Sequence, residues 1–162
     1  MKILVTTLGS HGDVQPFVAL AKALKAAGHE VTICTLEGFR PFVEAHGVSY
    51  AHVNNEFFTL MQTQEGQSSI DGGGGKLELV RKAQGILRRV FDDEWQAAQT
   101  VQPELMIFHP KALGSAHIAE KLNVPLMMAL PLPLYTPTGA FPNPLFGGMN
   151  LGGWLNRLSY WP

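Results

Sequence analysis

The sequence predicts an α/β fold built on a doubly wound parallel β-sheet. Three observations predict it: short apolar runs without polar alternation, helical stripes between them, and glycine or proline at the joins. A run that is apolar on both faces is typical of a strand buried between two layers of helices. The alternation of such runs with helices favours parallel strands joined by right-handed crossovers.

The first half of the chain provides three strands and two helices. We expect strands at residues 2–7, 30–35 and 48–53, and a short helix at residues 40–46. The longer helix follows a turn at residues 9–13, with Asp13 as its candidate cap, Pro16 in its first turn and Gly28 at its end. Its apolar stripe consists of Phe17, Leu20, Ala21 and Leu24.

The second half continues the pattern after an interruption. Residues 54–75 are polar, contain four consecutive glycines and show neither period, so we interpret them as a loop. The remaining elements are helices at residues 76–100, 112–122 and 151–160, and strands at residues 104–108 and 124–130. We place Asp92, Asp93 and Glu94 on the polar face of the first of these helices.

Composition narrows the class of protein. Hydrophobic residues make up 46% of the chain and charged residues 15%, which is typical of a globular domain. The net charge of −1 gives no electrostatic reason to expect a nucleic-acid partner or an anionic membrane. The single cysteine, Cys34, excludes an internal disulfide and suits a reducing cytoplasm. We therefore expect a cytoplasmic protein, with peripheral membrane attachment left open.

The loop after the first strand, Gly9-Ser10-His11-Gly12-Asp13, is the first candidate site. Ligands of open α/β sheets bind outside the carboxyl ends of the strands, where this loop lies. The glycines are spaced G-x-x-G, so the dinucleotide fingerprint G-x-G-x-x-G is absent. Asp13 is either a functional carboxylate or a residue that only caps the helix, and both interpretations remain open.

His109 is the second candidate, because it follows the fourth expected strand directly. A carboxylate and an imidazole at neighbouring strand ends could form a proton-transfer pair, so we expect His109 to approach Asp13. The alternative is that His109 only satisfies backbone groups of its loop. The other histidines show no metal-ligand spacing and no Asp-x-Asp follows a strand, so we expect no metal.

Two stretches of the chain resemble the sterol- and antibiotic-type glucosyltransferases. The first is MKILVTTLGSHGDVQPFVALAKALKAAGHEVTICT, which carries that family's Gly-[Ser/Thr]-x-Gly-Asp-[Val]-x-Pro pattern after the first strand. The second is PELMIFHPKALGSAHIAEKLNVP, followed by FGGMNLGGWLNRLSY. The similarity covers nearly the whole chain. It implies the N-terminal, Rossmann-like half of a GT-B fold, in which the first domain holds the acceptor and the second the nucleotide-sugar.

The resemblance also implies a chemistry. Members invert the anomeric centre and need no metal, and the nucleotide-sugar, UDP-glucose, is a co-substrate rather than a cofactor. Asp13 matches the proposed general base, and His109 takes the supporting position that an aspartate occupies in plant relatives. The acceptor would be a lipophilic hydroxyl compound such as a sterol or polyketide. Further acceptor-binding or loop residues are expected at Ser10, His11, Gly12, Phe57, Phe58, Met61, Leu134 and Tyr135.

The domain organisation expected from this resemblance is one acceptor domain over residues 1–162, incomplete at its C-terminal end and without its donor domain. Such a chain alone would be inactive, and it would self-associate through the apolar stripe of residues 151–160. Two alternatives stay open: a non-catalytic binding subunit that needs a separate partner chain, and a nicotinamide-dependent oxidoreductase domain. The missing dinucleotide fingerprint disfavours the oxidoreductase.

Overall fold

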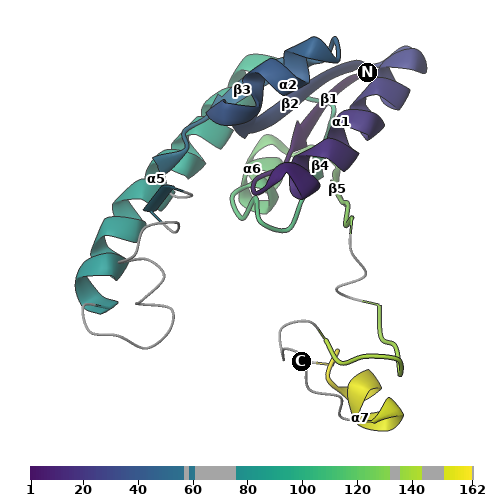
Figure 1. Cartoon of the computed structure of the whole chain (residues 1–162). Coiled ribbons are helices and arrows are strands. Elements are labelled where there is room, and N and C mark those ends of the chain that lie inside the picture. Colours follow the sequence, from purple (N-terminus) through teal and green to yellow (C-terminus); the bar gives the residue numbers. More distant parts are fainter. Residues whose placement is uncertain (57–58, 61–75, 132–135, 144–151, 162) are drawn as a thin grey trace. The chain divides into compact units, whose positions relative to one another are not determined.

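The computed structural model describes residues 1–56, 59–60, 76–131, 136–143 and 152–161, and for residues 76–83 only the course of the helix. These residues form two compact units, Met1–Ala129 and Leu130–Pro162. The first unit is an α/β domain with the expected alternation of strands and helices (Figure 1). The predicted fold class is therefore confirmed.

Five parallel strands make up the sheet of the first unit. They are β1 (Lys2–Thr6), β2 (Glu30–Leu36), β3 (Ser49–Val53), β4 (Leu105–Phe108) and β5 (Leu126–Met128), in the spatial order β3-β2-β1-β4-β5. The chain progresses from β1 to one edge and then, beginning at β4, to the other edge. The neighbours β1 and β4 thus form the topological switch point, where open α/β sheets bind their ligands.

Helices cover both faces of this sheet (Figure 1). One face packs against α1 (His11–Ala26) and α2 (Arg40–Ala45), which follows the short 3-10 helix η1 (Glu37–Phe39). The other face packs against α5 (Lys76–Val101) and α6 (Ser115–Leu122). Each face has its own core cluster, and strand β1 contributes to both. Ile3 and Val5 pack with α1 and α2, while Leu4 packs with α5 and α6, which explains why the strand is apolar on both faces.

The start of α1 differs from the prediction. The N-cap is Ser10 rather than Asp13, and Asp13 occupies the third helical position. Pro16 consequently lies inside the helix and not in its first turn. The sequence contains the capping-box pattern in a form with aspartate in place of glutamate, Ser-x-x-Asp, and this pattern moves the helix start three residues upstream.

The unit Leu130–Pro162 is organised around α7 (Gly153–Leu158). The Asn156 side chain is buried and donates to the Gly139 carbonyl at 3.0 Å. The opposite side of the helix is apolar and exposed, with Trp154 74% accessible and Leu155 and Leu158 also exposed. Self-association through these residues stays a prediction, which sedimentation velocity over a concentration series would check and a concentration-independent monomer would contradict.

Candidate functional site

The site begins where β1 and β4 end. Thr6 of β1 lies opposite Phe108 of β4 in the register of the sheet, and the His109 N–H donates to the Thr6 carbonyl at 2.9 Å. The loop after β1 and the loop after β4 therefore start side by side. The Thr7 hydroxyl donates to the Asp13 carbonyl at 2.8 Å, which fixes the start of α1 against the strand end.

Asp13 is buried, with 9% of its surface accessible, and its two carboxylate oxygens have different surroundings. Oδ2 accepts three hydrogen bonds: from the Ser10 N–H at 2.7 Å, from the Ser10 hydroxyl at 2.9 Å and from Lys111 Nζ at 2.8 Å. Oδ1 accepts none from the described residues and faces His109 Nε2 at 3.5 Å. Oδ2 thus anchors the carboxylate, and Oδ1 remains able to take a new donor.

The electrostatics favour the ionised form of Asp13. Burial raises the pKa of this carboxyl, but hydrogen bonds from Lys111 and Ser10 and the Lys111 charge outweigh burial, so the pKa lies below its usual 3.8. The carboxylate is therefore charged at neutral pH. Because its folded pKa is lowered, it stabilises the fold above pH 3.8 and loses that contribution as the pH falls through the folded value.

His109 is buried and neutral at physiological pH. Burial lowers its pKa and the Lys111 charge lowers it further, while the Asp13 charge acts in the opposite direction. The Lys111 N–H donates to Nδ1 at 3.1 Å, so the ring proton of the neutral form is on Nε2, the atom that faces Asp13. In this tautomer His109 presents Nε2–H, not a basic nitrogen, on the side of Asp13, 3.5 Å from Oδ1 and without a hydrogen bond to it.

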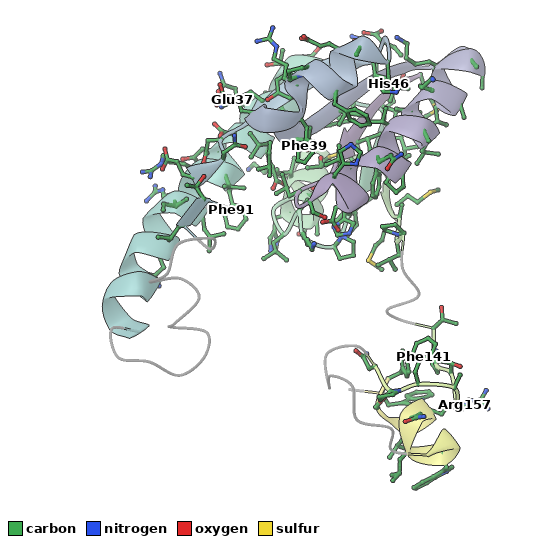
Figure 2. All side chains as sticks on the ribbon, viewed as in Figure 1. Glu37, Phe39, His46, Phe91, Phe141 and Arg157 are labelled. Carbon is green, nitrogen blue, oxygen red and sulfur yellow. The ribbon has the colours of Figure 1, made fainter. Side chains whose placement is uncertain are left out.

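The expected proximity of Asp13 and His109 is confirmed by the 3.5 Å distance, while their catalytic role stays a prediction. Of the other loop residues, Ser10 belongs to the site through its bonds to Asp13. The exposed His11 packs its ring against Phe42 and Phe39, the latter labelled in Figure 2, and its expected role in acceptor binding stays a prediction. Gly12 lies in the first turn of α1. The remaining expected residues, Phe57, Phe58, Met61, Leu134 and Tyr135, lie outside the described part of the chain.

Sequence reasoning missed Lys111, whose main chain fixes the His109 tautomer and whose side chain holds Asp13. Its signal was its place two residues after the end of β4, in the same strand-end loop as His109. Reasoning also misplaced Glu94, which is 1% accessible and lies among the largest buried side chains, not on a polar face. Its position on α5 turns it toward α6, where Ser115 Oγ donates to Oε2 at 3.2 Å.

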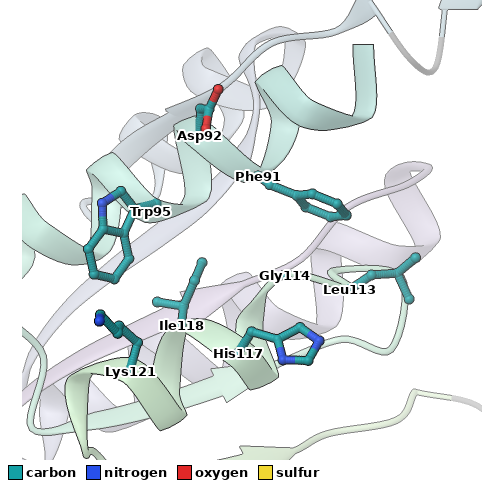
Figure 3. A pocket seen from close by; sticks show the side chains of 8 residues that line it. All are labelled: Phe91, Asp92, Trp95, Leu113, Gly114, His117, Ile118 and Lys121. Atoms are coloured by element: carbon teal, nitrogen blue, oxygen red, sulfur yellow. The ribbon is translucent and has the colours of Figure 1, made fainter. Parts of the chain in front are cut away.

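Two apolar cavities adjoin this region. One of about 390 Å³ is lined by Leu8, Val90, Phe91, Glu94, Lys111 and Leu113, among others, and so lies between α5 and the two strand-end loops. A second of about 560 Å³ lies between α5 and α6. Figure 3 shows Phe91 and Trp95 projecting from α5 into this second cavity, opposite Leu113 and Lys121. Phe91 and Leu113 line both cavities.

Within the described residues, no group of three or more His, Cys, Asp or Glu side chains could hold a metal ion. Among the same residues, no helix combines the length and apolar character that crossing a bilayer requires.

The sequence is similar to a known protein family. Residues 3–139 match the family described as the glycosyltransferase family 28 N-terminal domain. A sterol 3-beta-glucosyltransferase of Gibberella zeae is 36% identical over 99% of this chain, and one of Komagataella phaffii is 37% identical over 88%. The chain spans 11% of the length of each of these two relatives.

Solved structures agree with the fold. A glycosyltransferase of Streptomyces sp. SF2575 superimposes with a TM-score of 0.57 and 28% identity over 79% of this chain and 38% of that one. A second structure of that protein contains thymidine diphosphate. A calicheamicin glycosyltransferase superimposes with a TM-score of 0.58 at 16% identity, which bears on the fold alone.

Proposed function

Because the chain belongs to the glycosyltransferase family 28 N-terminal domain family, we propose that it binds the acceptor in a two-domain glycosyltransferase of GT-B fold. The reaction moves glucose from UDP-glucose to a hydroxyl of a lipophilic acceptor such as a sterol or polyketide. The relatives named as sterol 3-beta-glucosyltransferases support this acceptor class and sugar. A second domain or partner chain supplies most of the nucleotide-sugar site, and no cofactor or metal takes part.

One observation carries the proposal: a buried, ionised carboxylate at the switch point of the sheet with one oxygen anchored and the other open. Oδ1 of Asp13 accepts the proton of the acceptor hydroxyl while the hydroxyl oxygen attacks the anomeric carbon of the sugar. The bond from that carbon to the nucleoside diphosphate breaks, and the diphosphate leaves with the electron pair. A single displacement of this kind inverts the anomeric configuration.

His109 and Lys111 support the base in this proposal. Nε2 of His109 lies 3.5 Å from Oδ1 and occupies one of the directions from which a hydroxyl could reach it. Lys111 keeps Asp13 ionised and fixes its rotamer through Oδ2. The anchoring has a chemical cost, because a lowered pKa makes the carboxylate a weaker base, so catalysis depends on positioning more than on basicity.

A transfer assay on the complete protein tests the function. With labelled UDP-glucose and cholesterol we expect a β-glucoside, formed at an unchanged rate in the presence of EDTA. Product NMR reads the anomeric configuration. An α-linked product would contradict the single displacement, and loss of rate with EDTA would contradict the metal-independent mechanism. Binding of cholesterol without any transfer would instead favour the non-catalytic binding subunit.

Lys111→Met is expected to move the acid limb of the pH profile of kcat/KM to higher pH. Lys111 lowers the pKa of Asp13 by hydrogen bond and by charge, so its removal raises that pKa, and protonation then inactivates the base at higher pH. The control is Lys22→Met, an exposed lysine on the same helix as Asp13. An acid limb that stays in place in Lys111→Met would show that Lys111 does not tune the base.

A further inference from the structure

Glu94 is a buried carboxyl that the proposed mechanism does not use. It is 1% accessible, and Oε2 accepts one hydrogen bond, from Ser115 Oγ at 3.2 Å. Oε1 has no partner among the described residues. A buried polar atom without a partner destabilises a folded protein and so requires an explanation.

The surroundings of Glu94 point to a ligand. It lines the cavity of about 390 Å³, whose other walls include the apolar side chains of Leu8, Val90 and Phe91. That volume falls within the range of small-molecule pockets, which are mostly apolar with few convergent polar groups. Figure 2 shows Phe91 projecting from α5, the helix that also bears Glu94.

The same cavity is connected to the candidate base through Lys111. This residue lines the cavity and, with Nζ, holds Oδ2 of Asp13 at 2.8 Å. Leu8, at another wall, immediately precedes the Gly9–Asp13 loop. The cavity and the candidate base Asp13 therefore share Lys111 as a common neighbour.

We propose that the cavity holds the body of the acceptor and that Glu94 determines specificity by binding a second hydroxyl on it, distinct from the hydroxyl that receives the sugar. This inference rests on the proposed function. It narrows the acceptor from any lipophilic alcohol to an apolar skeleton that bears two separated hydroxyl groups.

A hydroxyl fits Glu94 better than other polar groups do. Burial raises the pKa of Glu94 to about 7, although the Ser115 hydrogen bond opposes the shift, so both protonation states occur near neutral pH. Because Oε2 accepts from Ser115, Oε1 carries the proton in the neutral form and donates it, whereas in the ionised form Oε1 accepts. A hydroxyl can both accept and donate, so it pairs with either form.

The experiment compares two acceptors of one skeleton, cholesterol and a cholesterol that carries a second hydroxyl on its side chain. Equilibrium binding of each tritiated sterol in detergent micelles gives the ratio of the two Kd values for the complete protein. The variants are Glu94→Leu, which has no polar group, and Glu94→Gln, whose amide still donates and accepts. Glu120→Leu, an exposed residue on α6, is the control, and thermal melting verifies that every variant is folded.

The wild type is expected to bind the diol at least about tenfold more tightly than cholesterol, because its buried oxygen gains a partner. Glu94→Leu should bring the ratio to about one and bind cholesterol more tightly, while Glu94→Gln and Glu120→Leu should keep most of the preference. A ratio that is the same in wild type and Glu94→Leu would overturn the assignment of Glu94.

Transfer of glucose to both sterols is measured in parallel, which separates the two hypotheses. Transfer with no effect of Glu94 on the binding ratio leaves the proposed function standing and overturns the specificity role. A Glu94-dependent ratio without transfer supports the second-hydroxyl site and overturns the catalytic function.

Discussion

Asp13→Asn is expected to lower kcat by roughly 10²–10⁴-fold, which is the usual contribution of a general base. The amide cannot take the proton of the acceptor hydroxyl, whereas its shape leaves the acceptor site intact, so KM for the acceptor should change little. The measurement is steady-state transfer by the complete protein with saturating UDP-glucose and a series of sterol concentrations.

The fold should survive this change at some cost in stability. An asparagine at the third helical position can still accept from the Ser10 N–H through its carbonyl oxygen, but it loses the ion pair with Lys111. The pH-dependent stability that ionised Asp13 contributes above pH 3.8 should disappear as well. Thermal melting at pH 3 and pH 7 reads both effects.

Glu30→Gln is the matched control for Asp13→Asn. It also removes one carboxylate, but Glu30 is the exposed first residue of β2, at the edge of the sheet opposite the site. Its kcat should equal that of the wild type. If Asp13→Asn also turned over at the wild-type rate, Asp13 would be only a member of the capping box, the alternative that the sequence left open.

The meeting of Asp13 and His109 was predictable because it depends on topology. Parallel strands place all their carboxyl ends on one edge, and a crossover pattern with β1 beside β4 brings those two loops together. Periodicity and strand composition are enough to predict a parallel sheet with both loops at its carboxyl edge. The expected strand at residues 2–7 is also confirmed, as β1 (Lys2–Thr6), whose apolar side chains contribute to both core clusters.

Lys111 and Glu94 were not predictable because their positions depend on contacts between elements that are distant in the sequence. Lys111 reaches Asp13 only because the loop after His109 turns its backbone N–H onto Nδ1 and its side chain back over the strand ends. Glu94 follows two acidic residues, and a local charge run is usually a solvated face. Its burial results from the close approach of Gly114, where a Cβ would lie 3.0 Å from Oε2.

Gly9→Ala is expected to disrupt the site at least as strongly as Asp13→Asn, by a different route. Gly9 has φ +139°, a conformation that side chains with a Cβ rarely adopt. A Cβ at this position would lie 2.2 Å from Oδ2 of Asp13 and 2.7 Å from its Cγ. The substitution must therefore distort the loop or expel the carboxylate from its three hydrogen bonds.

Backbone strain and overpacking each cost about 1–3 kcal/mol, so Gly9→Ala should lose roughly 2–6 kcal/mol of unfolding free energy. Activity should fall by more than about 10²-fold, since the base leaves its position. Urea denaturation and the transfer assay measure the two losses. Wild-type stability together with wild-type kcat would show that the loop accommodates a Cβ and that the carboxylate geometry is not required.

Gly12→Ala separates this steric argument from a general need for glycine in the motif. A Cβ at Gly12 would meet only Ser10 Oγ at 3.8 Å, an ordinary contact, and the position is helical. Alanine should therefore stabilise α1, by up to about 1 kcal/mol. If activity nevertheless falls while stability rises, the second glycine is required for the close approach of a substrate to the helix N-terminus, whereas the first glycine is required by Asp13 itself.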